Sequence, residues 1–181
     1  MPVGTPTLRL ATIEDVEAIE ALMKASTRDL FPRVYSEEQT RSSMEHIAVP
    51  DPMLIEDGTY FVIEVDGELV ACGGWSRRDK LYTGSGTGAT DARLLDPATE
   101  SARVRAMFVR SDWTRRGLGT LILEASVEAA KTEGFRTLSL MSTMPGLPLY
   151  EKYGFVIVAR VDIAMPDGMA IAGASMEKPV M

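Results

Sequence analysis

The sequence is poor in the residue types that bind metals or form disulfides. It contains one cysteine, Cys72, and one histidine, His46, among 181 residues. A single cysteine cannot form an internal disulfide, and the two residues together supply too few soft ligands for a zinc site. We therefore expect no metal, and we interpret both residues as structural.

Long hydrophobic runs are also missing. No apolar stretch approaches the roughly 18 residues that cross a bilayer, and the N-terminal segment MPVGTPTLRL lacks the apolar core of a signal peptide. These two absences predict a cytoplasmic protein with no membrane partner.

The chain has no overall excess of positive charge. Lys and Arg number 19 against 26 Asp and Glu, which gives a formal net charge of -7. Nonspecific binding to nucleic acid needs a basic face, so no nucleic-acid partner is expected. The 45% hydrophobic and 25% charged residues are typical of a globular protein, and the length fits a single domain over residues 1–181.

One short segment reverses this acidic balance. Its arginines, which only Asp112 opposes within the segment, are Arg103, Arg105, Arg110, Arg115 and Arg116. The last two stand directly before a Gly-x-Gly at Gly117 and Gly119. This concentration of charge on a glycine turn is the most informative feature of the sequence.

The hydrophobic pattern predicts an α+β protein. Strands are expected at 8–10, 59–65, 68–75, 102–110 and 136–143, with a closing hairpin of 156–165 and 170–178. Helices are expected from Thr12, from Ser36 toward Ile47, from Gly117 to Gly134 and over 148–155, and Pro50 and Pro52 are expected to interrupt the second of these.

Two connections stand out between these elements. Asp66-Gly67 joins two β-rich runs and suits a type I′ hairpin turn. Residues 77–100 are dense in Gly, Thr and Asp, which predicts a long surface loop, and long loops in compact domains are often functional.

The segment DWTRRGLGT, residues 112–120, predicts an anion site. A strand that turns on glycine into a helix exposes the unpaired N–H groups of the first helical turn, and these attract anions together with the helix dipole. Arg115 and Arg116 would be unfavourable there unless an external anion lay between them and the helix. The planar guanidinium suits phosphate oxygens, so a diphosphate or polyphosphate ligand is expected.

Other phosphate motifs fit less well. A P-loop needs a lysine after its second glycine, and a Rossmann fingerprint needs a third glycine where this chain has Ile122. A second glycine-rich run, GSGTGA from Gly84, has no strand-turn-helix context and is interpreted as a flexible loop.

Together, the strand VRAMFVR, the motif DWTRRGLGTLIL and the later segment PLYEKYGF resemble the GNAT superfamily of acetyl-CoA-dependent N-acetyltransferases. The phosphate signature of that family is Gln/Arg-x-x-Gly-x-Gly/Ala. The resemblance implies a central twisted sheet of about seven strands, mixed but mostly antiparallel, with helices on both faces. It also implies acetyl-CoA as cosubstrate and an amine as acceptor.

The resemblance assigns roles to individual residues. It implies that a splayed strand holds the pantetheine arm through Met107, Phe108 and Val109. It implies that the pyrophosphate is bound by the turn of Thr114, Arg115, Arg116, Gly117, Leu118, Gly119 and Thr120. Tyr150 matches the family tyrosine of Tyr-x-x-x-Gly-Phe, whose hydroxyl protonates the departing thiolate. The alternative for Tyr150 is an aromatic ring packed in the core.

The sequence departs from the family pattern at two positions. Thr114 stands at the first motif position, which removes a side-chain contact but no backbone donor. Arg103 occupies the position of the glutamate base found in several members. Glu100, Glu64 or a chain of waters could replace that base, or the amine could arrive already neutral.

The leading hypothesis is acetyl transfer to a primary amine by direct attack, with a strand N–H such as that of Val109 stabilising the oxyanion. The alternatives are a CoA-binding sensor without activity and an enzyme that uses another acyl-CoA. Phe31 and Tyr35 are expected to line the acceptor side. The acidic groups of the 77–100 loop, Glu100 included, suit a cationic amine or are ordinary surface charges. The closing strands could also pair in a homodimer.

Overall fold

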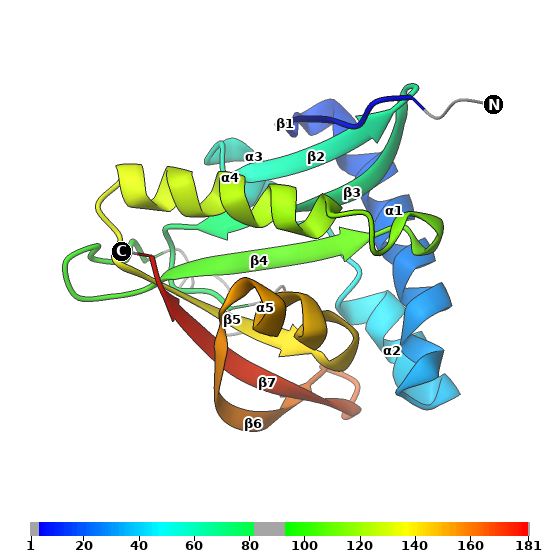
Figure 1. Ribbon diagram of the computed structural model, residues 1–181. Coiled ribbons are helices and arrows are strands. Elements are labelled where there is room, and N and C mark those ends of the chain that lie inside the picture. Colours follow the sequence, from blue (N-terminus) through cyan, green and yellow to red (C-terminus); the bar gives the residue numbers. More distant parts are fainter. Residues whose placement is uncertain (1–3, 82–92, 181) are drawn as a thin grey trace.

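One twisted seven-stranded sheet forms the centre of the computed structural model, which describes residues 4–81 and 93–180 (Figure 1). The strands are β1 (Thr7–Leu10), β2 (Tyr60–Val65), β3 (Glu68–Ser76), β4 (Ala102–Val109), β5 (Thr137–Thr143), β6 (Val156–Ala164) and β7 (Ala170–Pro179). Their spatial order is β1-β2-β3-β4-β5-β7-β6. Only β4 and β5 pair in parallel, which confirms the predicted mixed, mostly antiparallel sheet.

Helices cover both faces of the sheet, as predicted. The helices are α1 (Val16–Leu30), α2 (Glu37–His46), α3 (Pro52–Glu56), α4 (Leu118–Thr132) and α5 (Leu147–Tyr153). The first three lie behind the sheet in Figure 1, and α4 and α5 lie in front of it. Short 3-10 turns precede or follow them at η1 (Ile13–Asp15), η2 (Phe31–Arg33), η4 (Ser111–Trp113) and η5 (Met144–Gly146).

Alternation along β2 divides the apolar residues between these two layers. Tyr60 and Val62 pack with α1, whereas Ile63 and Val65 belong to the cluster formed with the start of α4. Because successive side chains of a strand point to opposite faces, one buried strand serves two cores. The turn that follows has positive φ at both Asp66 (52°) and Gly67 (82°), which confirms the predicted hairpin.

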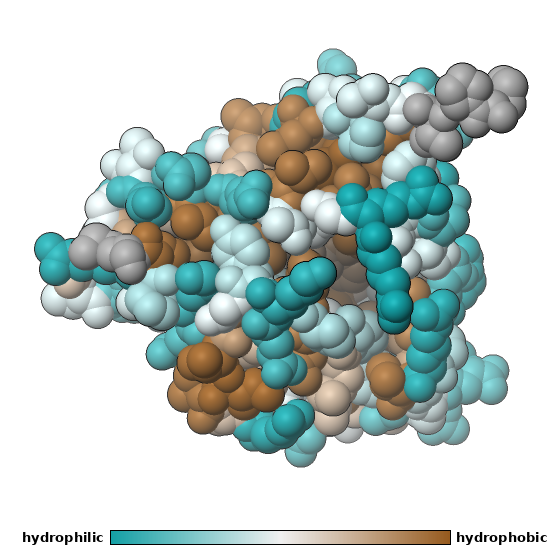
Figure 2. Space-filling view, viewed as in Figure 1, coloured by the Kyte–Doolittle hydropathy of each residue, from teal (hydrophilic) through white to brown (hydrophobic). Residues whose placement is uncertain are grey.

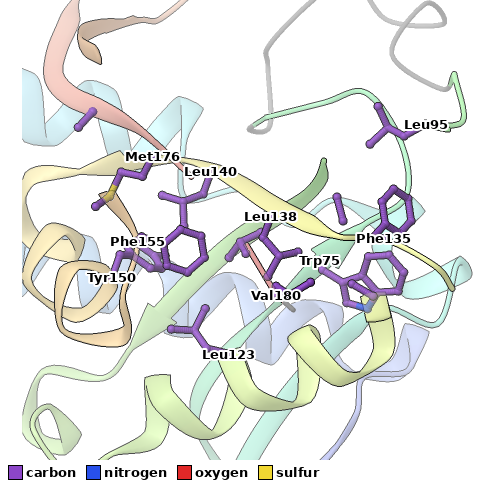
Figure 3. Close-up of a cluster of buried hydrophobic side chains, with 14 of the residues drawn as sticks. Trp75, Leu95, Leu123, Phe135, Leu138, Leu140, Tyr150, Phe155, Met176 and Val180 are labelled. Carbon is purple, nitrogen blue, oxygen red and sulfur yellow. The ribbon is translucent and has the colours of Figure 1, made fainter. Parts of the chain in front are cut away.

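The largest cluster of buried residues lies on the α4 and α5 side of the sheet and includes Leu95 from the segment before β4 (Figure 3). Figure 3 shows Leu123 of α4, Leu138 and Leu140 of β5, and Tyr150 and Phe155 around α5 converging on this cluster. The Tyr150 and Phe155 rings meet edge to face, with centroids 5.8 Å apart. This cluster fixes the position of α5, and therefore of Tyr150, relative to β4 and β5.

α2 ends at His46, before Pro50, as predicted, but Pro52 begins α3, a helix that the sequence analysis did not predict. Asp51 caps α3 by accepting a hydrogen bond of 3.1 Å from the Met53 amide, and Pro52 is the first helical residue. Proline suits this place because the amide it lacks would be unpaired there in any case. The helix predicted from Ser36 is α2, and Ser36 and Gln39 form a capping box at its start.

β4 and β5 separate soon after they begin. Their pairing is limited to Ala102 with Leu138 and Arg103 with Ser139, whereas β5 pairs with β7 along its whole length. A bulge in β4 places Ala106 at φ 50° and shifts the register against β3. The β5-facing edge of the rest of β4 therefore has no strand partner.

The described parts of the 77–100 segment carry paired charges. Arg93 contacts both Asp79 and Glu100 at 2.9 Å, and Arg78 forms an isolated bridge with Leu94. Asp79 and Glu100 are thus paired with an arginine of the same segment, whereas the Asp96 carboxylate accepts hydrogen bonds from the Ala98 amide and the Thr99 hydroxyl. The glycine-rich run from Gly84 lies outside the described residues.

Gly74 of β3 lies where the chain backbone leaves no room for a side chain. A Cβ there would collide with the carbonyl oxygen of Thr59 and lie 2.9 Å from the Tyr60 Cα, and neither atom can move without displacing backbone. We predict that Gly74→Ala lowers the free energy of unfolding by about 1–3 kcal/mol, as overpacking does. Urea denaturation followed by circular dichroism measures this loss, and an unchanged midpoint would contradict the packing described.

Candidate active site

The start of α4 presents unpaired backbone amides. The first intrahelical bond joins the Leu121 amide to the Gly117 carbonyl at 3.1 Å, so the amides of Leu118, Gly119 and Thr120 have no intrahelical partner. Gly117 holds the turn in the left-handed region at φ 80°. Amides that point out of a helix N-terminus, together with the helix dipole, bind anions such as phosphate.

The arginines of the preceding segment fall into two groups. Three are paired with carboxylates: Arg103 with Asp79 at 3.0 Å, Arg105 with Asp51 at 3.1 Å, and Arg110 with Asp112 at 2.6 Å and Glu68 at 3.2 Å. Arg115 and Arg116 form no ion pair with any described residue, and both are exposed beside the unpaired amides. The Arg116 guanidinium lies over the Trp113 ring, 4.5 Å from its centroid, which holds it near the turn. The uncompensated positive charge of the segment is therefore concentrated at the helix start.

The two glycines of the motif have different physical roles. A Cβ on Gly117 would meet no atom within 4 Å, so the positive φ is what favours glycine there, and the space beside it is open to a ligand. A Cβ on Gly119 would lie 2.6 Å from Leu149 Cδ2, so this glycine lets α4 and α5 approach closely. Gly119 thus serves helix packing, while its amide is one of the three at the start of α4 that have no intrahelical partner.

The end of β4 leads directly into this site. Met107, Phe108 and Val109 are half-buried, and they lie on the part of the strand that does not pair with β5. Ser26 of α1 donates a hydrogen bond of 2.7 Å to the Val109 carbonyl, and no pattern in the sequence indicates this contact. Figure 2 shows the surface hollowed between the start of α4 and α5, over this end of β4. A long flexible group could lie in this hollow against the free strand edge.

Tyr150 belongs to the core around α5 and is 7% exposed. Burial raises the pKa of its phenol above the usual value, so the hydroxyl keeps its proton at neutral pH. No hydrogen bond joins this hydroxyl to another described residue. The pKa of the buried Tyr60 is also raised, chiefly by burial. Tyr60 donates to the Ala106 carbonyl at 2.7 Å, so this phenol lies at the β4 bulge, and the adjacent Met107 packs against the buried cluster that contains Tyr150.

The carboxylates considered as a general base are engaged by arginines. Arg93 binds Glu100 at 3.0 and 2.9 Å, and this contact is the main reason that the pKa of Glu100 falls to about 2. Such a carboxylate is a poor proton acceptor at neutral pH. Glu64 is 3.1 Å from Arg9, between β1 and β2. Arg103, at the position of the family glutamate, donates to Ser139 at 2.7 Å across the short parallel pairing.

A cavity of about 610 Å³ lies beside the closing hairpin. Its lining residues are Val34, Tyr35, Gln39, Met144, Arg160, Val161, Asp162, Ala172 and Gly173. Tyr35, expected on the acceptor side, lines this cavity. Phe31 does not line it; its ring lies in the core against the Tyr35 ring, with the two ring centroids 5.2 Å apart. Arg160 and Asp162 were missed from the sequence. The alternation within VIVARVDIAM places both on one face of the strand and could have pointed to them.

Comparison with known proteins identifies the family. The chain matches the profile of the Acetyltransferase (GNAT) family over residues 19–155, and it therefore belongs to that family. The protein is an acetyltransferase. Comparison with curated proteins gave no match.

Solved structures share the fold over nearly the whole chain. A GCN5-related N-acetyltransferase from Rhodopseudomonas palustris is 22% identical, with a TM-score of 0.73 over 99% of this chain and 98% of that one. The PaiA N-acetyltransferase from Thermoplasma acidophilum, solved with coenzyme A, is 17% identical, with a TM-score of 0.70 over 97% and 99%. The ribosomal-protein-S18-alanine N-acetyltransferase from Escherichia coli is 17% identical, with a TM-score of 0.58 over 97% and 94%.

Two negative findings concern the described residues alone. In that part of the chain, no three His, Cys, Asp or Glu side chains come together in a way that could hold a metal ion. No helix within 4–81 or 93–180 combines the length and the apolar character that a membrane span requires.

The two groups of arginines make a matched test of the anion site. We predict that replacing Arg115 and Arg116 together by Gln weakens coenzyme A binding at least about tenfold, because each guanidinium contributes charged hydrogen bonds to phosphate. Isothermal titration with coenzyme A measures the dissociation constant. Arg110→Gln is the control, since this arginine is already paired with carboxylates. The affinity of this variant for coenzyme A should stay within about twofold of that of the wild type. Equal losses in both variants would contradict the assignment.

Proposed function

We propose that the protein transfers the acetyl group of acetyl-CoA to a primary amine of a small-molecule acceptor, by direct attack of the amine on the thioester. The observation that carries this proposal is the continuity of three features. Free amides and unpaired arginines at the start of α4 adjoin the unpaired edge of β4, and that edge includes Met107, which packs against the buried cluster that contains Tyr150.

The residues of the turn 114–120 would hold the pyrophosphate, with the backbone amides as donors and Arg115 and Arg116 as countercharges. Thr114 contributes less, because its hydroxyl already donates to the Ser111 carbonyl at 3.1 Å. Met107, Phe108 and Val109 would offer the free strand edge to the pantetheine arm. Binding along this edge places the reactive end of the cosubstrate away from the phosphate turn, toward Ala106.

This direction of binding changes the proposed oxyanion donor. Val109 is next to the phosphate turn, whereas the bulge at Ala106 contacts Tyr60 and adjoins Met107, which packs against the cluster that contains Tyr150. We therefore assign the oxyanion contact to a backbone amide at the bulge rather than to that of Val109. Donors fixed in this way stabilise charge that develops in the transition state without having to reorganise.

Tyr150 is proposed as the general acid. In the reaction an N–C bond forms to the acetyl carbon, the C–S bond breaks, and the amine nitrogen loses one proton to solvent. The departing thiolate takes a proton from the Tyr150 hydroxyl, which regains one from solvent. A buried phenol with a raised pKa is protonated before the reaction and can donate to a basic sulfur.

The removal of one hydroxyl tests this role. We predict that Tyr150→Phe lowers kcat by about 100-fold, within the usual range for a general acid, and leaves coenzyme A affinity unchanged. Because that hydroxyl bonds to no described residue, thermal stability should hardly change. Release of free thiol measures turnover.

Tyr153→Phe is the matched control for this substitution. Tyr153 also belongs to α5, and its ring stacks on Phe155 at 6.3 Å and contacts Lys178 at 5.8 Å. It should keep near wild-type kcat. A Tyr150→Phe variant with wild-type turnover would remove Tyr150 from the mechanism and leave it as a core residue.

A further inference from the structure

We propose that the cavity beside the β6–β7 hairpin is the acceptor site and that it selects a small zwitterion, a molecule that carries both an amine and an anionic group. This inference rests on the proposed function and names its substrate class. The cavity volume of about 610 Å³ lies within the usual range for small-molecule sites, which is roughly 300–1,000 Å³.

The cavity is built from segments that are distant in the sequence. Val34, Tyr35 and Gln39 come from the turn between α1 and α2 and from α2 itself, and Met144 comes from η5. β6 and β7 supply the remaining wall. Because η5 directly precedes α5, the wall that contains Met144 continues into the helix that carries Tyr150.

The link between the cavity and Tyr150 is short. Gly146 ends η5, and a Cβ placed there would lie 3.2 Å from the Tyr150 ring and 3.4 Å from Ser142 Oγ. The Tyr150 ring therefore lies directly against the turn that lines the cavity. An amine held in the cavity would approach the reaction centre past this turn.

Two of the four polar side chains that line the cavity are committed to the protein backbone. Tyr35 donates to the Ala172 carbonyl at 2.6 Å and accepts from the Met144 amide at 2.8 Å. Gln39 donates to the Ala170 carbonyl at 2.9 Å, and its amide oxygen caps α2. These bonds satisfy backbone groups of β7 beyond the end of β5, so Tyr35 and Gln39 act as fixed walls.

The other two polar side chains are charged and uncommitted. Arg160 and Asp162 form no ion pair or hydrogen bond with any described residue. In contrast, Arg78, Arg93 and Arg103, at the other end of the sheet, are each paired with a carboxylate. Arg160 and Asp162 stand two residues apart on one face of β6, so their Cα atoms are roughly 7 Å apart along the strand.

One positive and one negative group on the same wall define the complementary ligand. A simple amine would be attracted by Asp162 but repelled by Arg160. A simple acid would be attracted by Arg160 but repelled by Asp162. A compact molecule with an amine and a carboxylate or similar anion satisfies both. Arg160 would bind the anionic group, and Asp162 would attract the amine that receives the acetyl group.

A panel of amino acids, each compared with its own amide, tests whether the site recognises the anionic group. The pairs are 4-aminobutyrate with 4-aminobutanamide, β-alanine with β-alaninamide, and methionine with methioninamide. We expect at least one acid to have a kcat/KM about tenfold or more above that of its amide, measured by thiol release with acetyl-CoA. Arg160→Gln should raise KM for that acid about tenfold and leave its amide within about twofold. Asp162→Asn should raise KM for both, because they share the amine.

Arg136→Gln is the control variant. Arg136 is exposed, does not line the cavity, and also forms no ion pair with a described residue. It should leave both members of each pair unchanged. An equal effect of Arg160→Gln on acid and amide would show that Arg160 acts through general charge or stability, and the inference would be wrong.

The remaining outcomes separate this inference from the proposed function. If amides equal or exceed their acids throughout the panel, or if only the N-terminal amine of a test peptide is acetylated, the zwitterion site is wrong while amine acetylation stands. If no amine releases thiol from acetyl-CoA, the proposed function fails and the inference fails with it.

Discussion

The divergence of β4 from β5 is the constraint on which the rest of the site depends. These strands pair only at their first residues, and β5 is held instead by β7 along its full length. A sheet normally satisfies its own backbone groups, so an interior strand with a free edge needs another partner. The free edge ends at a helix whose first amides are also free, and the two together form the surface to which we propose that the cosubstrate binds.

Charge pairing then decides which positive groups remain available to a ligand. The chain is acidic overall, and its carboxylates neutralise most of the arginines of the 103–116 segment. The exceptions are Arg115 and Arg116 at the phosphate turn. Arg160 and Asp162 in the cavity are likewise unpaired within the described residues. Charged side chains without a partner beside an open space thus indicate both proposed sites, the pyrophosphate turn and the acceptor cavity.

The sequence predicted the features that depend on local chemistry. The hairpin at Asp66-Gly67, the capping box at Ser36 and the helix that follows Gly117 each follow from a few adjacent residues, and the structure contains all three. The helix that begins at Pro52 was not predicted, because proline both ends and begins helices, and only the cap at Asp51 distinguishes the two cases.

Features that depend on distant segments could not be predicted. The ion pair of Glu100 with Arg93, the contact of Ser26 with Val109 and the cavity each join parts of the chain that only the fold brings together. Tyr35 was placed on the acceptor side from its position between two helices, but its bonds to β7 required the tertiary structure. Motif residues are therefore visible in the sequence, whereas the groups that neutralise or support them are not.

The most direct test is a crystal structure of the protein with coenzyme A. The account predicts pyrophosphate oxygens within hydrogen-bond distance of the backbone amides of residues 117–120 and a pantetheine arm along the free edge of β4. A pyrophosphate bound elsewhere, with the start of α4 in contact with solvent alone, would contradict it.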